Sequence, residues 1–146
     1  MSPVVLIDDH LLLRTLLDDE PEGLRSGDVR LATTGLWYHR LCRALNDTTV
    51  LGSMSRQLGV PTEDVASAAV AAVVDLPEDI ELRSLRDLGW PLGAVVASGV
   101  RLNLISLEAI AAAEALEADI CLAPADENPP LLAVARQQGI VVRIVR

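Results

Sequence analysis

Short apolar runs alternate along the chain with longer stretches in which apolar residues recur at helical spacing. Four of the runs are rich in β-branched residues and suit buried parallel strands: residues 4–7, 80–82, 120–123 and 140–145. Strands that alternate with helices predict an α/β fold. We therefore expect a three-layer α/β/α sandwich around a central parallel sheet of four or five strands, in a single domain that spans residues 1–146.

Helix signals separate these runs. One helix is expected to open at Trp90-Pro91, with Pro91 at its first helical position, and two others are capped by Asn103 and Asn128. Residues 19–30 contain Pro and Gly and predict a loop. The expected helices cover residues 10–18, 34–45, 51–58, 62–76, 90–98, 104–117 and 129–138.

Polar side chains follow two of the expected strands. Asp8, Asp9 and His10 come directly after residues 4–7, and Asp126 follows residues 120–123. The helix capped by Asn103 is expected to begin at the same edge. Because ligands of parallel sheets bind beyond the carboxyl ends of the strands, this edge is the expected functional site.

The composition is acidic. Twenty-one acidic residues oppose 12 basic ones, for a net charge of −9, and every basic residue is Arg. This balance excludes a uniformly basic nucleic-acid binder and leaves only a local Arg patch for such a role. Cys42 and Cys121 lack the spacing of a zinc site. The longest apolar run, residues 65–74, is about half the ~20 residues of a membrane helix, so we expect a cytoplasmic protein with no membrane span.

The first segment resembles the start of a response-regulator receiver domain, in which paired acids hold magnesium. That family also needs a phosphoacceptor Asp at the end of its third strand and a Lys late in the domain. Residues 49–59 contain no Asp, and the chain contains no Lys. The receiver interpretation is therefore rejected.

Four segments follow one another along the chain: LIDDHLLLRTLL at 6–17, LWYHRLCRAL at 36–45, LNLISLEAIAAAEALEADICLAPAD at 102–126 and GIVVRIV at 139–145. Together they resemble the PIN-domain family, which includes the VapC-type toxin ribonucleases. The resemblance implies a PIN-like α/β/α fold. It also implies a homodimer and an antitoxin-like protein partner.

PIN nucleases gather three or four carboxylates around Mg²⁺ or Mn²⁺, which activates water and neutralises the scissile phosphate. By resemblance, Asp8 takes the place of the first acid and Asp126 that of the last, so these two are the expected catalytic and metal-binding residues. The second acid falls at Arg40, or at His39 if the register slips by one, and the third falls at Ser106. Two of the carboxylates are therefore missing.

Rare side chains gather in the two segments that would line this pocket. They form an expected substrate- or anion-binding group of His10, Arg14, Tyr38, His39, Arg40 and Arg43. In the alternative interpretation Trp37 is core, Tyr38 is a surface residue and the Arg side chains pair with Asp18 and Asp47.

We further expect Arg40 to pair with Asp8 or Asp126 and to take the electrostatic role of the metal. Asp9 and Glu108 are expected to point elsewhere.

Two functions follow from these residues. The first is a divergent PIN-domain protein whose metal-dependent ribonuclease activity is lost or reduced, and which acts by binding RNA, a nucleotide or a protein partner. The alternative is an active Mg²⁺- or Mn²⁺-dependent VapC-type toxin endoribonuclease of a toxin–antitoxin system. The missing acids favour the first.

Overall fold

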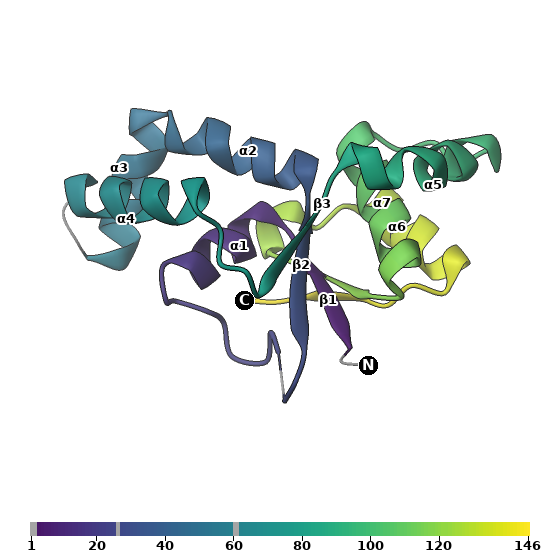
Figure 1. Ribbon diagram of the computed structural model, residues 1–146, viewed down its shortest axis with the longest axis horizontal. Helices are drawn as coiled ribbons and strands as arrows, with labels where there is room; N and C mark the ends of the chain where they lie inside the picture. Colours follow the sequence, from purple (N-terminus) through teal and green to yellow (C-terminus); the bar gives the residue numbers. More distant parts are fainter. Residues whose placement is uncertain (1–2, 26, 60–61) are drawn as a thin grey trace.

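Five parallel strands form the central sheet, in the order β3-β2-β1-β4-β5. The computed structural model describes residues 3–25, 27–59 and 62–146. Helices cover both sides of the sheet (Figure 1). The elements are β1 (Val4–Ile7), α1 (Asp9–Leu16), β2 (Arg30–Thr34), α2 (Gly35–Leu45), α3 (Thr48–Leu58), α4 (Thr62–Val74), β3 (Ile80–Arg83), α5 (Leu85–Ala97), α6 (Leu104–Leu116), β4 (Asp119–Leu122), the 3-10 turn η1 (Pro124–Asp126), α7 (Pro129–Gln138) and β5 (Val142–Ile144).

The two faces of the sheet carry separate cores. Val4 and Leu6 of β1 pack with α5, α6 and α7, whereas Val5 and Ile7 pack with helices α1 to α4. Figure 1 shows these two groups of helices on opposite sides of the strands. Because successive side chains of a strand point to opposite faces, a strand covered on both sides must be apolar throughout, as β1 is. The expected three-layer α/β/α architecture is confirmed.

Strand β2 completes the sheet of five strands and is not among the four strands that the apolar runs predict. Its sequence, RLATT, has few large apolar residues, and Thr33 and Thr34 are fully buried. Their hydroxyls are satisfied internally, since Thr33 Oγ1 donates to the Ile7 carbonyl at 2.9 Å and Thr34 Oγ1 accepts from Trp37 N at 3.2 Å. The expectation that residues 19–30 form a loop is therefore wrong at Arg30, where strand β2 begins.

Helix α5 begins earlier than expected. It starts at Leu85, so Pro91 lies inside the helix rather than at its first position. Leu88 and Val95 are buried in the core on the α5–α7 side, and Leu92 packs against it, so helical spacing continues across the proline. Packing of this apolar face outweighs the one backbone hydrogen bond that proline cannot donate.

Within the part of the chain that the structure describes, none of the helices combines the length and the apolar character needed to cross a membrane.

Candidate functional site

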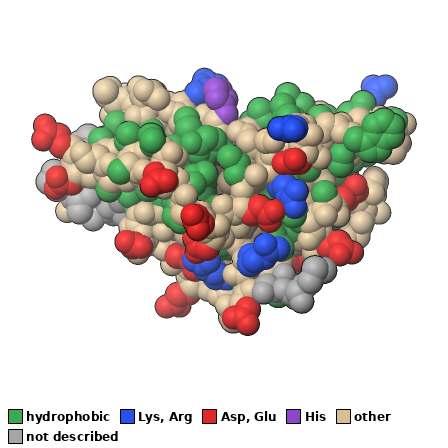
Figure 2. Space-filling model, viewed as in Figure 1, with side chains coloured by type: hydrophobic (Ala, Val, Ile, Leu, Met, Phe, Trp, Pro, Cys, Tyr) green, Lys and Arg blue, Asp and Glu red, His purple; other side chains and the backbone are tan. Residues whose placement is uncertain are grey.

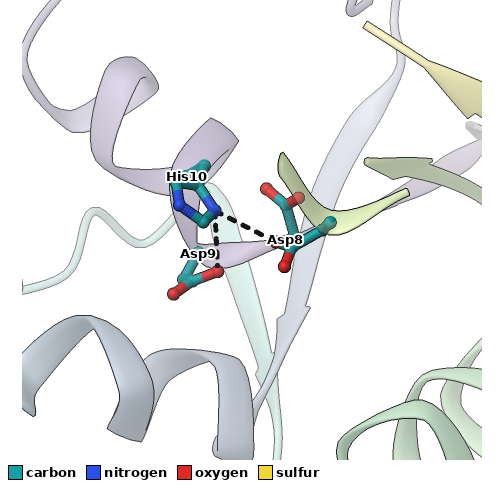
Figure 3. A group of neighbouring side chains, drawn as sticks. Asp8, Asp9 and His10 are labelled. Atoms are coloured by element: carbon teal, nitrogen blue, oxygen red, sulfur yellow. Dashed lines mark hydrogen bonds and ion pairs between the residues drawn. The ribbon is translucent and has the colours of Figure 1, made fainter. Parts of the chain in front are cut away.

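The acids predicted from the sequence meet at the carboxyl ends of β1 and β4. These two strands are neighbours in the sheet, so the residues that follow them, Asp8 and Asp126, come to the same edge. One ligand atom from each of Asp8, Asp9, His10 and Asp126 lies within 4.8 Å of the others. Figure 3 shows the first three at the start of α1. We call these four residues together with Arg40 the carboxylate cluster.

Asp8 is fully buried and joins two elements. Its Oδ1 caps α1 by accepting from Leu11 N at 2.8 Å, and its Oδ2 accepts from Ala123 N at 2.7 Å, just after β4. Burial and a hydrogen bond with Asp126 raise the pKa of Asp8 to about 7, against the lowering effect of the two backbone hydrogen bonds. Asp8 is thus a helix cap as well as a member of the cluster.

Arg40 joins two carboxylates of the cluster by donating a forked set of hydrogen bonds to them. Its Nε donates to Asp9 Oδ2 at 2.7 Å, and its Nη2 donates both to Asp9 Oδ1 and, at 2.6 Å, to Asp126 Oδ2. The expected pairing with Asp126 is present. The second partner is Asp9, although Asp8 was the other expected candidate. A planar guanidinium suits this bidentate geometry better than an ammonium group.

Asp9 was expected to point away from the pocket, and this is wrong. The expectation assumed that neighbouring side chains alternate, as they do in a strand. Asp8, however, is the extended cap residue and Asp9 is the first residue of α1, so the backbone turns between them. This turn brings the side chain of Asp9 to Arg40 and leaves it almost fully buried.

His10 supplies a second cation. Its Nδ1 lies 3.0 Å from Asp126 Oδ2 and 3.4 Å from Asp9 Oδ1, and Figure 3 shows the ring turned toward Asp9. Hydrogen bonds to these two carboxylates raise the pKa of His10 to about 10, although burial lowers it. At neutral pH the imidazole is therefore protonated.

The two cations hold two carboxylates in the ionised form. Burial raises the pKa of Asp9, but hydrogen bonds from Arg40 and His10 outweigh it and lower the value. Burial likewise opposes ionisation of Asp126, whose pKa is nevertheless held well below its usual range by hydrogen bonds from His10, Asp8 and Arg40. The charges of the cluster are therefore balanced from within the chain.

Residues 39 and 40 differ in their contacts with the carboxylates. Arg40 faces the carboxylates, whereas His39 is exposed to solvent. Trp37 is buried in the core, as the alternative interpretation expected, and it lines a hollow of about 60 Å³ with Arg40 and Asp126. Ser106 lines the same hollow, where it accepts from Asn128 Nδ2 at 3.2 Å.

The remaining predicted residues lie beside the cluster or away from it. Arg14 lines a neighbouring pocket of about 350 Å³ with Asp9 and His10, and pairs with Asp19 at 3.1 Å. Arg43 is exposed and borders another hollow, of about 290 Å³, next to Arg40. The Tyr38 hydroxyl instead donates to the Val73 carbonyl of α4 at 2.8 Å, so this ring packs between helices.

Glu108 is a buried acid of α6 outside the cluster. As expected, it turns away from the residue 106 position. Its Oε1 accepts from Leu36 N at 2.8 Å and so holds the first turn of α2, while its Oε2 has no hydrogen-bond partner among the described residues. No pattern in the sequence distinguishes this buried Glu from the exposed Glu114 and Glu117 that follow it.

The cluster has donor atoms for a metal ion, but cations of the chain already occupy several of them. Carboxylate oxygens are the ligands that Mg²⁺ and Mn²⁺ prefer, and a histidine must be neutral to bind a metal. Here Arg40 and a protonated His10 occupy oxygens of Asp9 and Asp126. A divalent ion would therefore have to compete with Arg40 and His10 for these oxygens.

No protein-family model matches the chain, and no curated protein matches it. The geometry of the site and the resemblance noted in the sequence are therefore the observations that bear on function.

Proposed function

We propose that this protein is a PIN-like domain in which an internal guanidinium takes the electrostatic role of a metal ion, so that it acts by binding rather than by metal-dependent ribonuclease chemistry. The observation that carries the proposal is the fork from Arg40 to Asp9 and Asp126. By resemblance, position 40 would carry one of the metal-binding carboxylates.

Electrostatics supports the loss of metal binding. Two unit charges about 4 Å apart interact by ~4 kcal/mol at an effective dielectric constant of about 20, so a divalent ion meets about twice this repulsion from a guanidinium that stays in the cluster. A protonated His10 adds to it. Ser106, which stands where the resemblance places another acid, is neutral and supplies no compensating charge.

The surface supports a local binding site rather than a broad nucleic-acid interface. Figure 2 shows acidic side chains spread over much of one face, with Arg side chains interspersed. A net charge of −9 opposes long contact with a phosphate backbone. RNA, a nucleotide or a protein partner would therefore have to be recognised at or near the cluster.

A cytoplasmic location is part of the same proposal. The two cysteines, Cys42 and Cys121, are both free thiols, which suits a reducing compartment.

One observation favours the alternative, an active Mg²⁺- or Mn²⁺-dependent VapC-type toxin endoribonuclease with a homodimeric form and an antitoxin-like partner. Asp8, Asp9 and Asp126 still converge within the reach of a single ion. If Arg40, about a third of whose side chain is exposed, left the cluster, these acids could bind the metal.

The two functions are separated by incubating purified protein with RNA and Mn²⁺. The proposal expects no cleavage by the wild type, and Mn²⁺ binding and cleavage that appear only in the double variant Arg40→Glu/Ser106→Asp. Cleavage by the wild type that is lost in Asp126→Asn would establish the alternative. Asp126 is a better test position than Asp8, since loss of Asp8 also removes a helix cap.

A matched control is available on α2. Arg43→Glu makes the same charge change as Arg40→Glu at an exposed position one turn away. Mn²⁺ binding that appeared equally in Arg43→Glu/Ser106→Asp would contradict the special role of Arg40.

A further inference from the structure

Two hollows adjoin one another at the start of α6. The larger, of about 540 Å³, lies along the connection between α5 and α6, and the smaller is the hollow of about 60 Å³ that reaches Arg40 and Asp126. Asn103, Ser106 and Asn128 line both. We call this combined feature the α6 groove. It begins beside the carboxylate cluster and extends away from it.

The orientation of the two Asn side chains in the groove is fixed by the backbone. Asn103 Oδ1 accepts from Ser106 N at 2.8 Å, and Asn128 Oδ1 accepts from Leu131 N at 3.3 Å. A backbone N–H can only donate, so in both residues the oxygen must face the helix and the NH₂ group must face outward. Both residues are therefore helix caps that present donors to the groove.

Ser106 extends the same pattern. It is buried, and its oxygen accepts from Asn128 Nδ2 at 3.2 Å, which leaves the hydroxyl proton for another acceptor. Among the described residues, the Asn103 Nδ2 has no hydrogen-bond partner. The acceptor oxygens of Asn103, Ser106 and Asn128 are used inside the fold. The hydrogen-bonding groups that remain unused are therefore donors.

The charged side chains of the groove have a positive balance. Arg101 and Arg40 line it, with Asp126 as the acid. Arg40 uses Nε and Nη2 on the cluster, and its Nη1 has no hydrogen-bond partner among the residues that the structure describes. Arg101 is exposed at the larger hollow. An acceptor-rich, negatively charged group is the chemical complement of this set.

We propose that the α6 groove binds a phosphomonoester of nucleotide size without a metal ion. A phosphate group offers acceptors to Asn103, Ser106 and the Arg side chains, and the larger hollow leaves room for the body of the ligand. Val96, Val100 and Leu102 form an aliphatic wall there. Trp37 is too deeply buried to stack on a base, so the body contacts the aliphatic wall. The inference rests on the proposed function, because it assumes that no metal ion occupies the cluster.

Isothermal titration calorimetry in EDTA tests this inference with adenosine 5′-monophosphate as the probe, and with adenosine and inorganic phosphate as comparisons. We expect the monophosphate to bind at least tenfold more tightly than either. Adenosine that binds as well as its monophosphate would overturn the phosphate assignment. Inorganic phosphate that binds as well would overturn the nucleotide-sized ligand, and no binding of any probe would overturn the site.

Asn103→Asp is the most informative variant. Asp keeps the cap oxygen that accepts from Ser106 N, so α6 still folds, but it replaces the NH₂ donor with a negative oxygen. We expect the affinity for the monophosphate to fall at least tenfold, and Arg101→Gln to weaken it severalfold. Unchanged affinity in Asn103→Asp would contradict the donor argument.

The control variant is Gln137→Glu. It makes the same charge change on α7, at an exposed position about 14 Å along the helix from Asn128, and should leave binding unchanged. Failure of this inference is distinct from failure of the proposed function. Metal-dependent RNA cleavage by the wild type would contradict the proposed function, whereas absence of metal-free monophosphate binding would contradict only the assignment of the α6 groove as a ligand site.

Discussion

The carboxylate cluster and the α6 groove lie side by side, yet they are built in opposite ways. In the cluster, Arg40 and His10 satisfy Asp9 and Asp126, so charge is balanced before any ligand arrives. In the groove, Asn103 and Asn128 use their acceptors to cap helices, and among the described residues the Asn103 Nδ2 and the Ser106 hydroxyl proton stay unused. A region that is complete in itself contributes to stability, whereas a region with unused donors is the one suited to binding.

The largest expected effect comes from breaking the cluster. Arg40→Leu removes the partner of two mostly buried carboxylates, and we expect the free energy of unfolding to fall by about 2–3 kcal/mol at pH 7, less than for a fully buried pair because Arg40 is partly exposed. Urea denaturation measures this change. Arg43→Leu, at an exposed position of α2, should stay within about 0.5 kcal/mol. Equal effects of the two substitutions would contradict the assignment.

The second-largest expected effect comes from Asp8, which we expect to stabilise the fold. Asp8→Asn keeps one acceptor oxygen but turns an NH₂ group toward a backbone N–H, so one of the two hydrogen bonds, to Leu11 or to Ala123, is lost. We expect a loss of about 1–3 kcal/mol in urea denaturation. The matched control is Asp47→Asn at the exposed cap of α3, where Asn caps as well as Asp and the change should be negligible.

A smaller effect should appear in the pH dependence of stability. His10 gains affinity for its proton on folding, so its contribution is fully present below its ordinary pKa near 6.5 and is lost as the pH rises through about 10. The raised pKa of Asp8 acts in the same direction between about pH 4 and 7.

We therefore expect His10→Gln to flatten the fall in denaturation midpoint between pH 6.5 and 10. Because His10 is half exposed, the difference should not exceed about 1 kcal/mol. A variant that keeps the full slope over this range would show that another group causes it.

The smallest effect should come from the groove. Ser106→Ala removes one hydroxyl, and the Asn128 amide that donates to it is partly exposed and can use water instead. We expect a change in unfolding free energy of at most about 0.5 kcal/mol, measured as for Arg40→Leu. A loss as large as that of Arg40→Leu would show that the groove is built for stability, which would remove the contrast with the cluster.

Periodicity was sufficient to predict the layers, the four apolar strands and the meeting of Asp8 with Asp126, because each depends on local pattern and on the parallel order of neighbouring strands. It did not predict β2, whose buried Thr33 and Thr34 are satisfied by hydrogen bonds made only in the folded chain.

The contacts of individual side chains were harder to predict. The position of Asp9 depends on where the cap of α1 falls, and a shift of one residue reverses the direction of its side chain. The direction of Tyr38 depends on α4, which lies far along the chain. Local spacing placed Arg40 at the border between the apolar and polar faces of α2, and only the tertiary structure shows that it bridges two acids.

Glu108 connects the helix that begins at the α6 groove with the helix that carries Arg40. It lies on α6, one turn beyond the start of the groove, and its carboxylate holds Leu36, which precedes Arg40 by one helical turn on α2. The hydrogen bond between Glu108 and Leu36 therefore links α6, which begins at the groove, directly to α2, which carries Arg40.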